Sequence, residues 1–327
     1  MRKILFRTNG GLGKQIMATA IAAQIKKQYP DSILHVVTSY PEAFAHLDCV
    51  DKYFPGNPQP YFYDEHKDFE ILDAEPYTDL EYRQGKMHLI DVWCKKLGLN
   101  MPQEKRGYIN LTSGEKEMAA KMLGNIPQDK PIIAFQFRGG TSYYDPNAAN
   151  DPLRAKQTRD LDTETAQKVV NALISKSCII LQIGLPTEPK LQNVLNLDPN
   201  NVINPRLLFA LLDRCQGLLA IDSFAAHAWA ALGRKDSAVI LWGGTNPTNL
   251  SYAGHSALTS EKGKDCPTLH CNRPETFVGD FVGNNQPWAC PRNGICMKFD
   301  PVMIVEAVTG AISLPQSSSP QECKKAA

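Results

Sequence analysis

The chain has 327 residues, which favours two domains over one, because a single domain usually holds about 100 to 200 residues. Its composition is 43% hydrophobic and 21% charged, and no apolar run approaches the roughly 18 residues that a membrane-spanning helix needs. Lys and Arg together number 35 against 34 acidic residues, so no strong overall charge draws the chain toward nucleic acid or anionic lipid. Composition therefore excludes a membrane span, and binding to nucleic acid would require a local basic groove.

The start of the chain, MRKILFRTNG, carries basic residues before an apolar stretch that is too short for a secretory signal. We therefore expect a cytoplasmic protein. Nine cysteines would suit a disulfide framework in a small secreted domain, but in a large chain without an export signal they indicate reduced thiols or a metal site.

Short apolar runs alternate with helical patterns in the first part of the chain. The sequence predicts a strand over 3–7, a helix over 15–28, a strand over 32–38, irregular structure over 40–80, and a helical pattern that ends near Gly98. A polar, partly helical connector follows.

Strand and helix then alternate again without a break. We expect strands in 131–137, 178–184, 217–221 and 237–243, and helices over 162–175, 206–213 and 224–232. The pattern predicts an α/β protein of two Rossmann-like domains, whose parallel sheets face a cleft and bind ligands at the carboxyl ends of the strands. We place the domains at 1–125 and 126–300, followed by a C-terminal helix and a loose tail over 301–327.

The Gly-rich turn GGLGKQ stands between the first strand and the first helix. It fails the Walker pattern at Thr8 and Gln15, and it fails the dinucleotide fingerprint at Ile16. A flexible turn at a helix N-terminus still points backbone N–H groups at an anion, and the alternative is a tight turn without a ligand. The residues of this turn that we place at the ligand are Gly11, Gly13 and Lys14.

A second Gly turn, FRGGTSYY at 137–144, again follows a strand. Arginine grips two oxygens and lysine adds a point charge, so these residues suit a diphosphate; the alternative is solvated surface charge. The expected phosphate-binding residues are Arg138, Gly140, Thr141 and Lys156, with Arg159 nearby. Glu188, after the strand CIILQIG, is the candidate for a ribose or base contact.

The pair of aspartates in DLD at 160–162 matches the Asp-x-Asp by which many sugar transferases hold a divalent metal. Asp162 also directly precedes a helical pattern with Glu164 in its first turn, which is typical of an N-cap. The sequence favours capping over metal binding.

The segment LLAIDSFAAHAWAALG brings Asp222 and Ser223 to a strand end at the start of a helix, with His227 near the first turn. The next strand ends in WGGTNP, which contains Gly243 and Thr245. These residues and the open N–H groups of the helix point to a phosphate or ribose site, whereas the alternative is that Asp222 or Ser223 only caps the helix.

The stretch IDSFAAHAWAALG followed by VILWGGTNP is similar to the nucleotide-binding half of glycosyltransferase family 9, the heptosyltransferases that elongate bacterial lipopolysaccharide. That family shows an Asp-Thr/Ser-Gly-x-x-His-x-Ala pattern on a helix, then a strand ending in Gly-x-Thr-x-Pro. The likeness covers most of the chain in outline and is specific from about 217 to 250. It implies the GT-B architecture, with the acceptor on the N-terminal domain, a nucleotide sugar on the C-terminal domain, inversion at the anomeric carbon and no metal requirement.

The chain departs from this family at two positions. The family has an Asp after its first strand, to which the resemblance would assign the role of general base, whereas this chain has Lys14. A protonated lysine cannot accept a proton, although it can neutralise a phosphate. Phe224 replaces a family Gly and narrows the approach to the helix, so heptose specificity is not carried over.

Four cysteines gather near the end of the chain as Cys266-x4-Cys271 and Cys290-x5-Cys296, with 18 residues between the pairs. Such spacing can make a tetrahedral thiolate site for structural zinc, and the alternative is a loop of thiols without a metal. His255 and His270 are either further ligands of such a site or polar loop residues, and we expect the latter.

Together these features predict a glycosyltransferase that moves a sugar from a nucleotide-diphosphate sugar to a hydroxyl acceptor on a saccharide, with no cofactor required for catalysis. We expect Lys14 to contact the donor phosphate across the cleft. The remaining candidates for the general base are Asp64, Asp73, Asp91 and Asp145. Two alternatives stay open: transfer onto hydroxymethylated bases of viral DNA, and a non-catalytic nucleotide-sugar binder.

Overall fold

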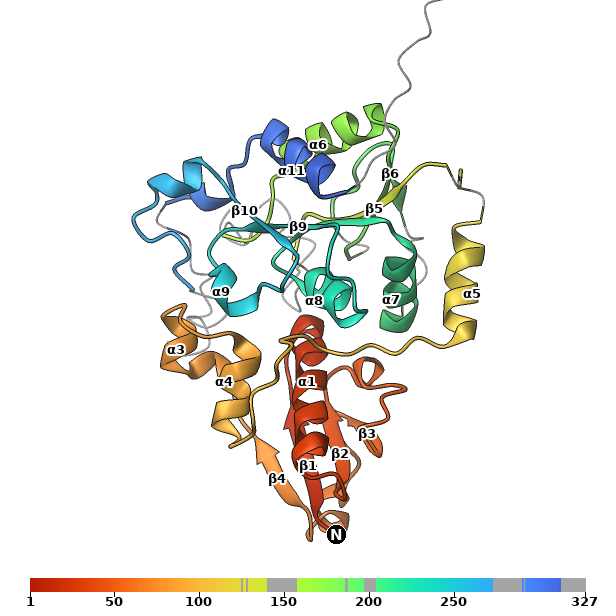
Figure 1. The fold of residues 1–327 in the computed structure, drawn as a ribbon, viewed down its shortest axis with the longest axis vertical. Helices are drawn as coiled ribbons and strands as arrows, with labels where there is room; N and C mark the ends of the chain where they lie inside the picture. Colours follow the sequence, from red (N-terminus) through yellow and green to blue (C-terminus); the bar gives the residue numbers. More distant parts are fainter. Residues whose placement is uncertain are drawn as a thin grey trace, which may run out of the picture.

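The computed structural model (Figure 1) describes residues 1–124, 126–127, 129–139, 158–185, 188–196, 204–272, 290 and 292–312. Its strands form two separate sheets, and all the strand pairings that the structure describes are parallel. The predicted α/β class with two parallel sheets is confirmed.

The first sheet has four strands in the order β3-β2-β1-β4. The strands are β1 (Lys3–Thr8), β2 (Ile33–Thr38), β3 (Lys52–Pro55) and β4 (Glu70–Asp73). Ile4, Leu5 and Phe6 are fully buried, as expected for the apolar run of a strand covered on both faces. The helices and turns that accompany the sheet are α1 (Leu12–Gln28), η1 (Pro41–Ala43), α2 (Phe62–Glu65), η2 (Pro76–Thr78), α3 (Leu80–Arg83), α4 (Leu89–Lys96) and α5 (Ser113–Met122).

The second sheet has six strands in the order β10-β9-β8-β5-β6-β7. The strands are β5 (Ile132–Gln136), β6 (Ile179–Gln182), β7 (Leu195–Asn196), β8 (Gly217–Ile221), β9 (Ala238–Trp242) and β10 (Ser256–Thr259). The accompanying helices and turns are α6 (Thr163–Ser175), α7 (Pro205–Arg214), α8 (Phe224–Ala231), α9 (Pro247–Leu250), η4 (Lys262–Asp265), η5 (Ile295–Met297) and α11 (Pro301–Ala311). In Figure 1, α6 and α11 cover one face of this sheet, and α7 and α8 cover the face toward the first sheet. Every residue of β5, β8 and β9 is buried between these layers.

The two parts meet where α1 packs on α8 (Figure 1). Helix α1 is buried at almost every position from Lys14 to Ile25, because it lies between its own sheet, α4 and α8. The strands of the first sheet end at residue 73 and those of the second begin at residue 132. A domain boundary at 125/126 is kept as our proposal.

Three segments differ in detail from the predictions. The helical pattern before Gly98 is two helices, because Gly85 with a φ of +69° ends α3 and His88 caps α4 by accepting from the Ile90 N–H. The connector contains α5, which begins with a capping box between Thr112 and Glu115. The segment predicted as irregular contains β3 and β4, which are short and mostly exposed and so carry no apolar pattern.

None of the helices within the described ranges is both long and apolar enough to span a bilayer. Helix α11 starts the predicted C-terminal segment, and residues 313–327 lie outside the described part of the chain.

Candidate functional site

The carboxyl ends of β5 and β8 are tied together by one buried side chain, Gln136. Its Nε2 donates to the Ser223 hydroxyl at 3.0 Å and to the Arg138 carbonyl at 3.0 Å, while its Oε1 accepts from the Ala225 N–H at 3.3 Å. Ser223 is the N-cap residue of α8 but makes no capping bond with its side chain. The Ser223 oxygen therefore lies at the edge of the sheet rather than over the helix end, which weakens the simple capping alternative for this residue.

Cationic side chains surround the same edge. Arg138 donates to the Thr163 hydroxyl at 3.3 Å, and its Nε is buried and has no hydrogen-bond partner among the described residues. Arg159 donates through Nη2 to the Asp222 carbonyl. Two guanidinium groups at the strand ends, beside the positive end of the α8 dipole, form a site suited to an anion.

The two aspartates of DLD have other partners. Asp162 caps α6, since its Oδ1 accepts from the Thr165 N–H at 2.9 Å and its Oδ2 accepts from the Thr165 hydroxyl at 2.8 Å. Asp160 accepts from the Gly139 N–H at 2.9 Å. The capping interpretation of Asp162 is confirmed.

Glu188 lies beyond the end of β6 and is buried. Burial raises the pKa of Glu188 to about 7; nearby Asp160 also raises it, whereas Arg138 acts in the opposite direction. Its Oε2 has no hydrogen-bond partner in the described part of the chain, and it fills the space beside Gly184, where a Cβ would lie 2.1 Å from it. The unpartnered Glu188 carboxyl oxygen and the unpartnered Arg138 Nε are both buried, and a ligand with hydroxyl groups could satisfy them.

His227 lies on α8 and contacts both halves of the molecule. Its Nδ1 hydrogen bonds to the Tyr252 hydroxyl at 2.7 Å, and burial lowers the pKa of His227 to about 4, so the ring is neutral near pH 7. A Cβ on Gly13 would lie 2.7 Å from Cδ2 of this ring and 3.3 Å from the Phe224 Cα. Gly13 is thus required for the close approach of α1 to α8, and Phe224, where the resembling family has Gly, lies at this contact.

Gly13→Ala should lower the free energy of unfolding by about 1–3 kcal/mol, because the buried His227 ring has to move. Urea denaturation measures this change. Gly114→Ala is the matched control, since Gly114 is also the second residue of its helix and nothing lies within 4 Å of its would-be Cβ. Alanine there should be neutral or add up to about 1 kcal/mol, and equal losses in both variants would contradict the contact.

The turn after β9 is packed rather than open. A Cβ on Gly243 would lie 2.3 Å from the Thr158 carbonyl, and the Gly243 carbonyl bonds His270 Nδ1 at 2.9 Å. Thr245 is partly exposed just before α9. The structure therefore places Gly243 at the strand end in a packing role, with Thr245 nearer to solvent.

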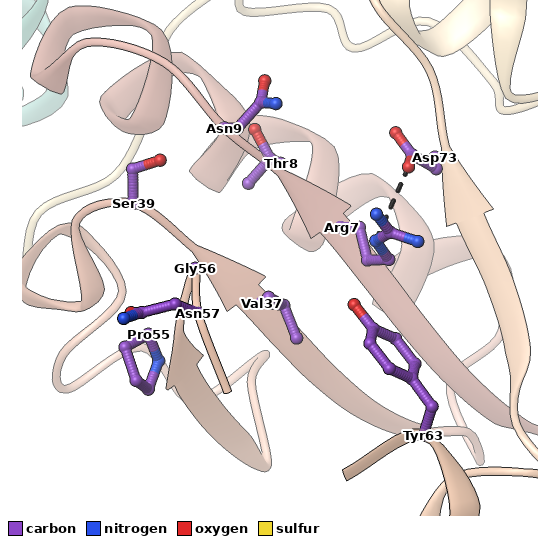
Figure 2. Close-up of a pocket in the computed structure, with 10 residues that line it drawn as sticks. All are labelled: Arg7, Thr8, Asn9, Val37, Ser39, Pro55, Gly56, Asn57, Tyr63 and Asp73. Atoms are coloured by element: carbon purple, nitrogen blue, oxygen red, sulfur yellow. Dashed lines mark ion pairs between the residues drawn. The ribbon is translucent and has the colours of Figure 1, made fainter. Parts of the chain in front are cut away.

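A pocket of about 430 Å³ opens at the carboxyl ends of the first sheet (Figure 2). In it, Arg7 faces Asp73 across neighbouring strands at 3.6 Å and lies 5.5 Å from the centre of the Tyr63 ring. The pocket is lined by Arg7, Thr8, Asn9, Val37, Ser39, Pro55, Gly56, Asn57, Tyr63 and Asp73. Hydroxyl, amide and charged groups dominate, so the pocket can hydrogen bond a polyhydroxyl compound.

Lys14 does not face open solvent. Its side chain is 7% exposed, its Nζ lies 2.5 Å from Glu75 Oε2, and it sits 5.5 and 5.4 Å from the centres of the Tyr77 and Trp93 rings. Glu75 was not identified from the sequence. The only sequence signal for this residue is its position, two residues after the end of β4. The expected contact of Lys14 with a phosphate is untested, and Glu75 is its partner in this structure.

The other candidate bases are scattered. Asp64 lies in α2 and does not line the pocket, although its neighbour Tyr63 does. Asp91 is buried in α4, with an ion pair to Lys105 at 2.6 Å. Asp73 lines the pocket. Four residues that the sequence predicts at the site lie outside the described residues: Gly140, Thr141, Asp145 and Lys156.

The four clustered cysteines line one pocket of about 230 Å³ together with His270. Burial, together with the neighbouring thiols of Cys290, Cys271 and Cys266, raises the pKa of Cys296 to about 12. Within the part of the chain that the structure describes, no three metal-ligating side chains come close enough to hold an ion. Cysteine sulfurs and a histidine nitrogen are ligands that zinc and iron accept, but these side chains do not come together into a metal site in this structure. Structural zinc therefore stays a prediction.

Comparison with protein-family models gave no match, and comparison with curated protein sequences gave none either. Solved structures do match. A family 9 glycosyl transferase from Veillonella parvula aligns over 94% of this chain and 96% of its own, with a TM-score of 0.61 and 11% identity.

Two heptosyltransferases resemble the chain to a similar degree. The E. coli ADP-heptose lipopolysaccharide heptosyltransferase II covers 81% of this chain and 92% of its own, with a TM-score of 0.55 and 13% identity. The dodecameric, iron-containing heptosyltransferase TibC in complex with ADP-D-β-D-heptose covers 94% of this chain and 76% of its own, with a TM-score of 0.62 and 10% identity. The expected resemblance is therefore confirmed at the level of the fold: this chain has the GT-B architecture of glycosyltransferase family 9 and heptosyltransferase structures.

Proposed function

We propose that this protein is a glycosyltransferase that moves a sugar from a nucleotide-diphosphate sugar to a hydroxyl group of a saccharide. The observation that supports it most is that each of the two parallel sheets carries a different polar site at the carboxyl ends of its strands. One site has arginines and a helix N-terminus suited to a diphosphate, and the other is a pocket suited to hydroxyl groups.

The donor belongs on the second sheet in this proposal. Arg138 and the N-terminus of α8, with Asp222 and Ser223, would hold the diphosphate, and Glu188 would bind the ribose or base. Positive charge aimed at the departing phosphate stabilises the transition state, so we propose that these groups act without a divalent metal. TibC is described with a bound ADP-sugar, which makes ADP-heptose the first donor to test.

The acceptor belongs in the pocket of the first sheet. The hydroxyl would then attack the anomeric carbon from the side opposite the diphosphate, which inverts that carbon. Arg7, Asn9 and Ser39 are suited to hydrogen bond neighbouring hydroxyls of a saccharide.

The experiment is to incubate the protein with a panel of ADP-, GDP-, UDP-, CDP- and dTDP-sugars, beginning with ADP-heptose, and to measure release of the nucleoside diphosphate with and without added saccharides. The expected result is release from at least one donor that an acceptor accelerates and that EDTA leaves unchanged. A thermal shift without release would instead identify a non-catalytic binder, and transfer only to hydroxymethylated DNA would identify the viral-type activity.

We also propose that the cysteine pocket holds a structural metal. Elemental analysis of the purified protein should find about one zinc or iron per chain, and Cys266→Ser with Cys271→Ser should remove it. Absence of both metals from protein purified without chelator would overturn this proposal.

A further inference from the structure

The pair formed by Lys14 and Glu75 is the feature of the cleft that the proposed function leaves unexplained. The Glu75 side chain is 39% exposed, although its partner Lys14 is almost fully buried. Glu75 Oε2 accepts from Lys14 Nζ at 2.5 Å, and Oε1 accepts from the Tyr77 N–H at 3.1 Å. An ionised carboxylate has about four acceptor sites, so the oriented carboxylate keeps lone pairs that solvent or a substrate can reach.

The pair lies where the two halves meet. Lys14 follows Gly13, where Phe224 and His227 at the start of α8 leave no room for a Cβ. Burial raises the pKa of Tyr77, and the charges of Asp222 and Glu75 raise it further while Arg159 opposes them. A carboxylate of the first half, Glu75, and one of the second, Asp222, therefore both act on the Tyr77 hydroxyl.

The other acidic candidates lack this position. Asp73 is held by Arg7 inside the pocket, two residues before Glu75 along the chain. Asp91 is buried and paired with Lys105. Glu75 alone among them combines exposure, fixed orientation and contact with the first turn of α1.

We propose that Glu75 is the general base of the sugar transfer and that Lys14 is the positioning residue that orients it; this rests on the proposed function. The first turn of α1 thus carries a lysine, and the carboxylate is supplied by the segment after β4. The acceptor oxygen forms a bond to the anomeric carbon of the donor, and the bond from that carbon to the phosphate oxygen breaks, leaving its electron pair on the diphosphate. The hydroxyl proton passes to Glu75 and then to solvent.

The test uses the full chain and the donor that releases its diphosphate fastest in the panel above. Glu75→Gln keeps the size and the hydrogen-bond acceptor but cannot take a proton, so kcat should fall by about 10²- to 10⁴-fold. Affinity for the free nucleoside diphosphate, measured by titration calorimetry, should change less than about 3-fold, because Glu75 does not hold the donor in this proposal. Glu70→Gln is the control. Glu70 is the first residue of β4, at the end of the strand away from Glu75; it pairs with Arg2, and its side chain is 45% exposed.

Azide distinguishes a base from a structural group, because it is an anionic nucleophile with no proton to lose. Sodium azide should restore diphosphate release in Glu75→Ala by at least about 10-fold and form a glycosyl azide, with little effect on the unmodified protein. Lys14→Met should lower kcat more than it raises KM, because the carboxylate loses the partner that orients it while the groups proposed to bind donor and acceptor are unchanged.

Three results would overturn the inference. Glu75→Gln with more than a third of the original kcat excludes a base at this position. Loss of rate in Glu75→Ala that azide does not restore assigns Glu75 a structural role. If the unmodified protein releases no diphosphate from any donor, the proposed function itself fails, and this inference fails with it.

Discussion

Lowering the pH from 7 to 5 should remove about 4 kcal/mol from the free energy of unfolding through two buried histidines, while protonation of buried Glu188, whose pKa is raised to about 7, adds back about 2 kcal/mol. Burial lowers the pKa of His227 to about 4, and burial together with the charge of Lys105 lowers that of His88 to about 3. The unfolded chain takes up protons on both below about pH 6.5, whereas the folded protein does not. Stability therefore falls by about 1.4 kcal/mol per pH unit for each histidine as the pH drops from 6.5 toward 4.

Urea denaturation across this pH range measures the slope, and His88→Asn tests its origin. Asparagine is also a good N-cap, so it can replace the acceptor that His88 offers to the Ile90 N–H, but it does not titrate. The stability that the variant loses between pH 7 and 5 should be smaller by about 2 kcal/mol, which is the contribution of His88. His46→Asn is the control, because His46 is exposed and asparagine tolerates its φ of 62°; a His88→Asn slope equal to that of the unmodified protein would refute the assignment.

Arg206→Met should lower the free energy of unfolding by about 3 kcal/mol, because it leaves a largely buried carboxylate without its cation. Arg206 is 8% exposed and grips Glu115 with two bonds of 2.7 and 2.9 Å. Its guanidinium also donates to the Glu42 carbonyl at 3.3 Å and to the Asn110 carbonyl. The side chain thus joins α7 below the second sheet to α5 and to the loop of η1 beside the first.

The contribution of the Arg206–Glu115 pair to the free energy of unfolding depends on pH. The bond from Arg206 holds the pKa of Glu115 at about 2, so the contribution is present above about pH 4.5 and is lost as the pH falls toward 2. Guanidinium denaturation should show this loss in the unmodified protein and not in Arg206→Met. Arg214→Met, at the exposed end of the same helix, should change stability by less than about 0.5 kcal/mol; a similar loss in both variants would mean that the ion pair does not stabilise the fold.

Four of the six strands of the second sheet and the helices α6, α7 and α8 followed directly from the sequence, whereas the short edge strands β7 and β10 did not. β5, β8 and β9 are buried along their whole length, so each is a continuous apolar run, and each is followed by a turn. The N-cap at Asp162 was equally readable, because its signal is local. These are features that a few neighbouring residues determine.

The candidate site is built from contacts between residues that are far apart in the sequence, and no local sequence pattern reveals such contacts. Lys14 and Glu75 are 61 residues apart and meet only because β4 pairs beside β1. The pocket of the first sheet is assembled from the ends of four strands, two of which are too short to be recognised. Gln136 looked like an ordinary strand residue, although it joins the ends of β5 and β8. Sequence reasoning therefore identified the edge of the second sheet and missed the partner of Lys14.

The most direct measurement of the central claim is a crystal structure of the protein with the nucleoside diphosphate that the donor panel identifies. The claim predicts phosphates beside the N-terminus of α8 within hydrogen-bond distance of Arg138 or Ser223, with Glu75 exposed to the space where the sugar would lie. A diphosphate bound instead in the pocket of Arg7 and Asp73, or among the four cysteines, would contradict it.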